Sequence, residues 1–189
     1  MTLPEILSRH EPSDESEAED LARIRAFVSL HPQPFDRSIA QGHLTASAMV
    51  LTADGQRVLL LFHQKLRRWL QPGGHAEDGE TQGETVALRE ALEETGLSGL
   101  LLHPDAPRPL DVDVHDIPAR GHEPAHEHLD LRYLVIADPS AAIQPAEGET
   151  TKVRWFSWDE LPALDLDHGL RRALTKARYW CERTRPGNG

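Results

Sequence analysis

The chain has 189 residues, a formal net charge of −11 and a single cysteine. This length fits one domain with terminal additions and is sufficient to bury a hydrophobic core. The negative charge argues against nucleic acid as the main partner, because binding a phosphate polyanion needs a basic face. A lone Cys181 excludes an internal disulfide framework, and we expect it to be a packing residue. Without an apolar run of membrane-span length or a signal-like N-terminus, the prediction is a cytoplasmic protein.

The first segment, Thr2–Leu30, has a helical pattern. We expect Ser13 to cap a helix that ends at Leu30, before Pro32 and Pro34. This arm precedes the core of the protein. Three roles stay open for it: packing on the core, closing a site, or mediating dimerisation.

Two strands, Leu44–Thr52 and Gln56–Phe62, are predicted around the turn at residues 53–55, which is a hairpin signal. The run Val58–Phe62 is continuously apolar, as in a strand that is buried on both faces. A loop, His63–Leu70, follows, and a helix is expected at about Gly83–Thr95.

The second half of the chain alternates strands and loops before a final helix. Expected strands lie at Leu100–His103, Leu110–Ile117, Leu129–Ala137 and Lys152–Phe156, expected loops at His103–Pro109, Pro118–His128 and Asp138–Thr150, and helices from Asp159 and over Asp167–Arg183. Strands that alternate with helices, with hairpins among them, indicate an α/β fold in which a mixed sheet lies between helices.

The most informative segment is Gly73–Leu97, GGHAEDGETQGETVALREALEETGL. Glu90, Glu93 and Glu94 are spaced i, i+3 and i+4, so their carboxylates emerge on one helix face. Like charges repel there unless a cation lies among them, and carboxylate oxygens suit Mg²⁺ or Mn²⁺. The alternative is an acidic helix face that is merely solvated.

The neighbours of these acids favour the metal site. Gly73 and Gly74 predict a tight turn whose carbonyls can point at an ion. Arg89 can pair with Glu93 or with Glu80, and Gly96 is expected to end the helix.

Together these residues resemble the Nudix box of MutT-like hydrolases. Gly74 is followed by five residues and Glu80, and the rest of the pattern is met by Arg89, Glu90, Glu93, Glu94, Gly96 and Leu97. Two departures occur: eight residues instead of seven separate Glu80 from Arg89, and the small Ala91 takes a position for a bulky apolar residue. The resemblance covers roughly Gly42 to Leu161.

This resemblance implies an α/β/α sandwich with a mixed sheet. We predict a Nudix domain at residues 39–165, an N-terminal helical extension at 1–38, and a C-terminal helix and tail at 166–189. It also implies metal-dependent hydrolysis of a phosphoanhydride in a nucleoside diphosphate linked to another moiety, X, and Nudix proteins are often homodimers. The alternatives are an enzyme similar to isopentenyl-diphosphate isomerase and a non-catalytic nucleotide-binding regulatory module, since fold does not fix function.

The resemblance also assigns roles to residues of the box. The Gly74 carbonyl and Glu90, Glu93 and Glu94 become candidate ligands of Mg²⁺ or Mn²⁺, with Glu90 as the alternative general base. Arg89 would orient Glu93 or Glu80 and not contact substrate. A further acid often arrives from a late loop in the family, where this chain has Glu147 and Glu149. Either is a candidate to complete a metal shell or to act as the base, and the alternative is an ordinary loop acid.

Three basic residues, Lys65, Arg67 and Arg68, precede the box on an expected loop. They are candidates for binding the substrate's phosphates, and the alternative is a solvated charged turn.

Histidine is frequent, at 11 residues, and several of these histidines are candidate metal ligands. His126, His128 and Asp130 alternate, so on a strand they face the same way, and imidazoles with a carboxylate suit Zn²⁺, Mn²⁺ or Fe²⁺. His43 and His75 match positions of metal-binding histidines in isopentenyl-diphosphate isomerases, which share the Nudix fold.

We therefore predict a second transition-metal site of His43, His75, His128 and Asp130, with His126 as an alternate ligand. The alternative is a set of surface histidines, or one that hydrogen-bonds to substrate. The isomerase activity itself is disfavoured, because Gly73 stands where those enzymes have a catalytic cysteine.

Overall fold

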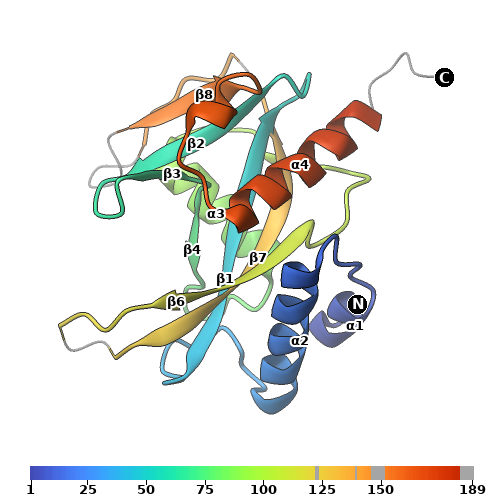
Figure 1. Cartoon of the computed structure of the whole chain (residues 1–189), viewed down its shortest axis with the longest axis vertical. Helices are drawn as coiled ribbons and strands as arrows, with labels where there is room; N and C mark the ends of the chain where they lie inside the picture. The colour runs from blue at the N-terminus through green and yellow to red at the C-terminus, as the bar shows by residue number, and fades with distance from the viewer. Residues whose placement is uncertain (122–123, 139, 146–151, 184–189) are drawn as a thin grey trace.

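The computed structural model describes residues 1–121, 124–138, 140–145 and 152–183, and Figure 1 shows the path of the chain. The helices are α1 (Leu3–Ser8), α2 (Glu15–Leu30), α3 (Gly83–Thr95) and α4 (His168–Arg183), with a short 3₁₀ helix, η1 (Leu161–Ala163). The strands are β1 (Gly42–Thr52), β2 (Arg57–His63), β3 (Arg68–Leu70), β4 (Gly73–His75), β5 (Leu101–Leu102), β6 (Asp111–Ile117), β7 (His126–Ala137) and β8 (Val153–Ser157).

Within these ranges the eight strands form one mixed sheet centred on β1. β1 runs parallel to β7 over its whole length, with Gly42 opposite Glu127 and Thr52 opposite Ala137. The other pairings are antiparallel: β1 with β2 and β4, β2 with β3 and β8, and β7 with β5 and β6. β1 is the central strand and is buried throughout. The side chains at its start therefore lie next to those of the neighbouring strands β4 and β7.

Helices cover both faces of this sheet (Figure 1). On one face, Leu44, Ala46 and Ala48 of β1 share a core with α3 and with the N-terminal helices. On the other face, Met49 and Leu51 pack with α4. The alternation of side chains along β1 sends its residues to the two layers in turn. The predicted α/β/α arrangement with a mixed sheet is confirmed.

The N-terminal arm packs on the core, which is one of the three roles left open by the sequence. Leu7 of α1 and Leu21 and Ile24 of α2 are buried in the same cluster as the α3 residues. The prediction that Ser13 caps the helix is wrong, because the Asp14 carboxylate accepts the hydrogen bond from the Glu17 backbone N–H. The arm therefore contains two helices, α1 and α2, separated by residues 9–14.

A buried ionic cluster ties this arm to the C-terminal helix. The Glu17 carboxylate accepts hydrogen bonds from His10 and from Lys176 of α4. Lys176 also donates a hydrogen bond to the Asp111 carboxylate of β6. The same carboxylate accepts a hydrogen bond from Arg172 of α4 at 2.8 Å. Burial alone would raise the pKa of Glu17, but its hydrogen bonds to His10 and Lys176 hold that pKa well below the usual range.

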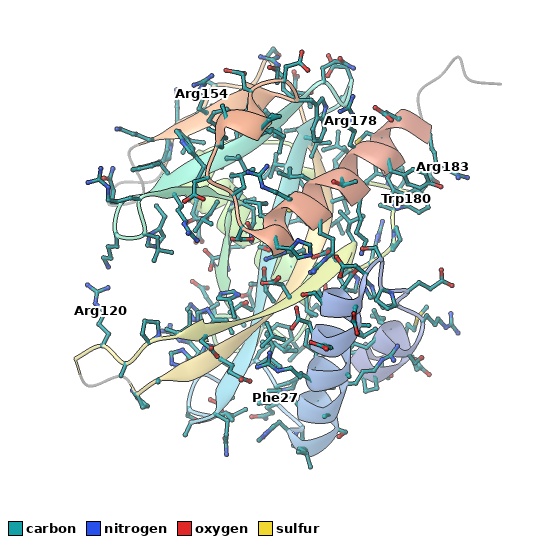
Figure 2. The ribbon with its side chains drawn as sticks, in the orientation of Figure 1. Phe27, Arg120, Arg154, Arg178, Trp180 and Arg183 are labelled. Carbon is teal, nitrogen blue, oxygen red and sulfur yellow. The ribbon has the colours of Figure 1, made fainter. Side chains whose placement is uncertain are left out.

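The end of α4 is attached to the hairpin turn by an aromatic contact. Trp158 donates from its indole N–H to the carbonyl oxygen of Gly55 at 2.9 Å. Arg178, which is labelled on α4 in Figure 2, lies over the Trp158 ring. None of the described helices is both long and apolar enough to cross a membrane.

Three local predictions, two before the box and one before β7, are wrong, and sheet pairing is the reason in each case. Gly73 and Gly74 lie in β4, paired with Ser47 and Ala46 of β1, and not in a tight turn. Arg68 starts β3 and is not in a loop, because it pairs with His63 of β2. The predicted loop Pro118–His128 is shorter than expected, since β7 already begins at His126.

Candidate active site

Helix α3 spans the predicted residues, Gly83–Thr95. Its apolar side packs on the sheet, which explains why the box has the small residue Ala91. Val86, Ala87 and Ala91 are fully buried against the sheet. The buried position of Ala91 brings the helix backbone close to the strands. Gly96 ends the helix in the left-handed conformation (φ 69°), and a Cβ there would lie 1.9 Å from the Gln144 carbonyl oxygen. The helix end is therefore fixed by a position that only glycine fits.

The guanidinium group of Arg89 is the centre of the candidate active site. Its Nη1 atom donates to Glu90 at 3.0 Å and to Glu93 at 3.1 Å. Its Nη2 atom donates to Glu80 at 3.0 Å and to the backbone carbonyl oxygen of His75 at 2.6 Å. One cation therefore holds three carboxylates and the backbone of β4.

The pairing of Arg89 with Glu80 shows that the additional residue in the box is accommodated before the helix. Residues 76–82 connect β4 to α3, and Glu80 folds back so that its carboxylate accepts the Glu77 N–H. The hydrogen bond from Arg89 lowers the pKa of Glu80, and that same bond raises the pKa of Arg89. Both groups are therefore charged at neutral pH.

Two carboxylates of α3 lie directly against β4. The Glu94 carboxylate accepts a hydrogen bond from the Gly73 N–H at 2.9 Å. The Glu90 carboxylate fills the space where a Gly74 side chain would be, since a Cβ on Gly74 would lie 2.6 Å from Glu90 Oε1. The glycine pair therefore provides room for the acids, which is a close approach and not the tight turn that was predicted.

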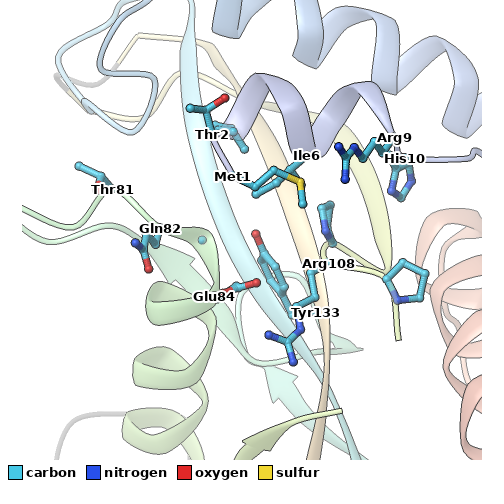
Figure 3. A pocket seen from close by; sticks show the side chains of 14 residues that line it. Met1, Thr2, Ile6, Arg9, His10, Thr81, Gln82, Glu84, Arg108 and Tyr133 are labelled. Carbon is cyan, nitrogen blue, oxygen red and sulfur yellow. The ribbon is translucent and has the colours of Figure 1, made fainter. Parts of the chain in front are cut away.

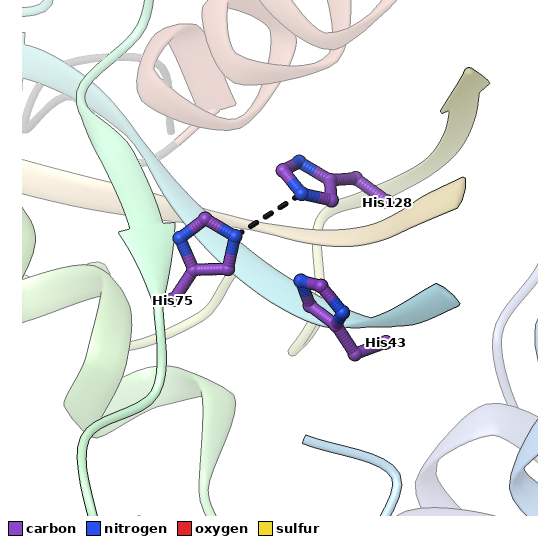
Figure 4. Close-up of side chains that lie close together, drawn as sticks. All are labelled: His43, His75 and His128. Atoms are coloured by element: carbon purple, nitrogen blue, oxygen red, sulfur yellow. Dashed lines mark hydrogen bonds between the residues drawn. The ribbon is translucent and has the colours of Figure 1, made fainter. Parts of the chain in front are cut away.

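A cluster of histidines lies beside these acids, on the strands β1, β4 and β7. His43 and His128 are opposite each other in the parallel β1–β7 pair, and His75 directly follows Gly74. One ring nitrogen from each of these three residues lies within 4.8 Å of the others. Figure 4 shows the three rings, with Nε2 of His75 and Nε2 of His128 3.1 Å apart.

The pKa values of His43 and His128 favour neutral imidazoles. Burial, followed by the neighbouring His75 and His126, lowers the pKa of His43 to about 4. Burial and the neighbouring His75 lower the pKa of His128 to about 2. Neutral imidazole is the form that binds metal ions.

Asp130, which was predicted to be a metal ligand, does not lie among the potential ligands. Its carboxylate accepts hydrogen bonds from Ser47 at 2.6 Å, from Thr45 at 3.1 Å and from Arg132 at 3.2 Å. The group of potential ligands within the described residues contains His43, His75 and His128 without it. His126 is closer to that group, since its Nε2 lies 3.3 Å from Nε2 of His128.

The predicted phosphate-binding residues lie around the β2–β3 turn. Lys65 and Arg67 are exposed in the turn itself, and Arg67 has a positive φ of 55°. Arg68 is exposed on β3 and pairs with Asp165 at 3.3 Å. Glu147 and Glu149, the predicted acids of the late loop, lie outside the described residues.

Sequence reasoning missed a cavity of about 660 Å³ between the N-terminal arm and the start of α3. Figure 3 shows Met1, Thr2 and Ile6 of the arm facing Tyr133 of β7 across it. A second cavity, of about 670 Å³, is lined by residues 31–37 and by the loop that carries Glu80. Neither has a local sequence signal, because the walls come from segments far apart in the chain.

Comparison with known proteins agrees with this geometry. The model of the NUDIX domain matches residues 42–177. A Bacillus subtilis (strain 168) protein described as "Putative 8-oxo-dGTP diphosphatase" is 27% identical over 115 residues, which are 60% of this chain and 66% of that protein. The match thus spans slightly less than two thirds of that relative.

Solved structures show the same fold. A NUDIX-family hydrolase from Clostridium perfringens superposes with a TM-score of 0.58 at 24% identity, covering 76% of this chain and 98% of that one. A C. elegans Ap4A hydrolase in a binary complex gives 0.58 at 19% identity, covering 74% and 98%. The NUDIX domain of Shewanella oneidensis NrtR with ADP ribose gives 0.51 at 20% identity, covering 95% and 98%. This chain therefore belongs to the NUDIX domain family, the Nudix hydrolases, and its α/β/α sandwich is the Nudix fold.

Proposed function

We propose that this protein hydrolyses a phosphoanhydride bond in a nucleoside diphosphate linked to another moiety, with Mg²⁺ or Mn²⁺ as cofactor. The observation that carries the proposal is the gathering of Glu80, Glu90 and Glu93 around Arg89, with Glu94 held against Gly73. A solvated acidic helix face has no need of a central arginine or of a glycine strand that makes room for its carboxylates.

The residues present fit a hard divalent cation. Glu90, Glu93, Glu94 and the Gly74 carbonyl offer oxygen ligands, which such ions prefer. Glu90 lies in a space that any side chain on residue 74 would fill. When bound, the ion supplies charge neutralisation at the phosphate oxygens and a more acidic water.

The protein's own groups have distinct tasks in this reaction. Arg89 positions Glu90 and Glu93, because it donates to both from one nitrogen. Glu90 is a candidate to accept the proton of the attacking water, and Glu147 and Glu149 remain candidates for the same task. Lys65, Arg67 and Arg68 are proposed to contact the substrate's phosphates, where guanidinium groups form bidentate hydrogen bonds.

The substrate class is defined by the reaction and not by the fold. The relatives' names mention 8-oxo-dGTP, Ap4A and ADP ribose, which all contain a nucleoside attached to a phosphoanhydride chain. We propose that the substrate is of one of three kinds: a nucleoside triphosphate, a dinucleoside polyphosphate or a nucleotide sugar.

The two alternative functions have less support. An isomerase with a catalytic cysteine is disfavoured, because Gly73 has no side chain and Cys181 is buried in α4. A non-catalytic module needs none of the box acids, yet Glu80, Glu90 and Glu93 are ordered around Arg89, and Glu94 is held against Gly73.

The test is turnover of a substrate panel with Mg²⁺ or Mn²⁺, comparing the wild-type protein with Glu94→Gln. Glu182→Gln is the matched control, since Glu182 is an exposed acid paired only with Arg178 in the same helix among the contacts described. Cleavage of one class that falls by at least about 100-fold in Glu94→Gln alone supports the proposal. Unchanged turnover in Glu94→Gln contradicts the proposed role of Glu94, and tight binding without cleavage favours the regulatory module.

A further inference from the structure

Four imidazole rings meet at one end of the sheet, on strands that are distant in sequence. His43 comes from β1, His75 from β4, and His126 and His128 from β7. The centre of the His43 ring lies 5.0 Å from those of His75 and His128 and 5.1 Å from that of His126. Such a gathering of one residue type from three strands is not produced by local sequence bias.

The spacing of the nitrogen atoms suits a tetrahedral ion. Nε2 of His128 lies 3.1 Å from Nε2 of His75 and 3.3 Å from Nε2 of His126. Zinc–nitrogen bonds of about 2.0–2.1 Å place tetrahedral nitrogen ligands about 3.3–3.4 Å apart. The separations of His128 Nε2 from these two neighbouring nitrogens are thus close to those of ligands that share one ion.

Hydrogen bonding among neutral rings does not satisfy these contacts. His126 Nδ1 lies 3.0 Å from the Pro124 carbonyl oxygen, which only accepts, so this nitrogen carries the proton. Nε2 of a neutral His126 then has a lone pair directed at Nε2 of His128. The latter atom has at most one hydrogen, so it cannot complement both His126 and His75. A cation at this point removes the conflict, and the bond to Pro124 is the kind that orients a metal-binding histidine.

The His43 side chain gives a second, independent indication. The residue is 2% exposed, and within the described part of the chain neither of its ring nitrogens has a hydrogen-bond partner. Buried polar atoms without a partner are rare, and each calls for an explanation such as a missing ion. Here the unpartnered ring stands among the other three.

We propose that His43, His75 and His128 form a site for a divalent transition-metal ion, with Zn²⁺ as the best match and His126, beside His128, as the further ligand. Imidazole nitrogen suits Zn²⁺ and Co²⁺, whereas the all-oxygen acids around Arg89 suit Mg²⁺ or Mn²⁺, so the protein has two chemically distinct sites. The ion would join β1, β4 and β7, and would therefore fix the strand that carries Gly73 and Gly74.

The test is direct metal binding by the full chain, with no substrate present. The protein is stripped with a chelator and titrated with Co²⁺, whose visible absorption reports tetrahedral geometry, and then with Zn²⁺ in competition. We expect one intensely absorbing Co²⁺ per chain, displaced by Zn²⁺, and a higher Tm with either ion, because the ligands exist as a set only in the folded state.

Variants locate the ion. His75→Ala and His128→Ala are chosen because both side chains are only partly buried, and His43→Ala joins them if its circular dichroism is native. We expect each to lose the tetrahedral spectrum and to bind Co²⁺ at least about 100-fold more weakly. His168→Ala, in an exposed contact with Asp14, is the matched histidine control and should bind normally.

Glu94→Gln separates this proposal from the proposed hydrolysis. It should keep the tetrahedral Co²⁺ spectrum even though its turnover falls, so failure of either proposal leaves the other testable. The histidine site is overturned if wild-type protein shows no tetrahedral Co²⁺, if folded His75→Ala and His128→Ala retain it, or if Glu94→Gln abolishes it.

Discussion

Arg89 and His75 are joined by a hydrogen bond of 2.6 Å from the guanidinium group to the backbone carbonyl oxygen. The same guanidinium group holds Glu80, Glu90 and Glu93, and the His75 side chain belongs to the histidine cluster. Residue 75 therefore connects the candidate active site to the proposed second metal site. The orientation of the acids and the position of β4 depend on each other through this bond.

Arg89→Lys should impair turnover by positioning and not by loss of charge. Lysine keeps the positive charge but has only three donors, all on one nitrogen, so it cannot serve the four partners of Arg89 at once. We expect kcat to fall by roughly 10- to 100-fold, with a higher Mg²⁺ concentration needed for half-maximal rate. Arg178→Lys, at an exposed pair, is the control. A normal metal requirement in Arg89→Lys would refute this positioning role.

The two glycines of β4 should respond differently to alanine. In Gly74→Ala the new Cβ meets the end of the flexible Glu90 side chain, so that carboxylate must move. We expect at least about a tenfold loss of turnover, equivalent to about 1.4 kcal/mol, with little change in Tm.

In Gly73→Ala the Cβ meets Cβ and Cα of Ser47 and the Ala46 carbonyl oxygen, at 2.4, 2.7 and 2.8 Å. Backbone cannot move as easily, so we expect a stability loss of about 1–3 kcal/mol, measured by denaturant unfolding. If the two variants lose activity and stability in the same proportions, displacement of Glu90 by a side chain at residue 74 does not explain the loss of turnover.

Much of the fold could be predicted from the sequence, because its signals are local. The helix at Gly83–Thr95 follows from the spacing of apolar residues and from Gly96, and the hairpin at residues 53–55 from its turn residues. The strand β4 could not be predicted. It has three residues, two of them glycines, and exists only because β1 is beside it.

The candidate site was predicted in part for the same reason. The acids of the box are close in sequence, so one helix face was enough to group them. The histidines come from three strands, and only the β1–β7 register brings His43 opposite His128. Alternation along β7 correctly grouped His126 with His128. It could not show that Ser47 and Arg132 donate hydrogen bonds to the Asp130 carboxylate.

Cys181→Ala should leave turnover unchanged. The thiol is buried in the cluster under α4, apart from the box acids, and its removal leaves a small cavity. We expect a stability loss of about 1 kcal/mol in denaturant unfolding and no change in kcat. A large fall in kcat without unfolding would favour cysteine-dependent chemistry instead of metal-dependent hydrolysis.

Glu17→Gln should lower stability in a way that depends on pH. The pKa of Glu17 in the folded protein is far below its ordinary value of 4.5, so its charged form contributes stability that is fully present above about pH 4.5. As the pH falls below 4.5, the unfolded chain takes up the proton first, and this contribution is lost. At pH 7 we expect the variant to be less stable by up to about 3 kcal/mol, because Lys176 and His10 lose their charged partner.

The measurement is denaturant unfolding of both proteins between pH 7 and pH 3. The difference between them should shrink below pH 4.5 by no more than about 1.4 kcal/mol per pH unit, which is the limit for one proton. Glu182→Gln, in an exposed pair, should differ little from wild type throughout. A difference that stays constant down to pH 3 would mean that Glu17 stabilises the contact between the arm and α4 by its shape and not by its charge.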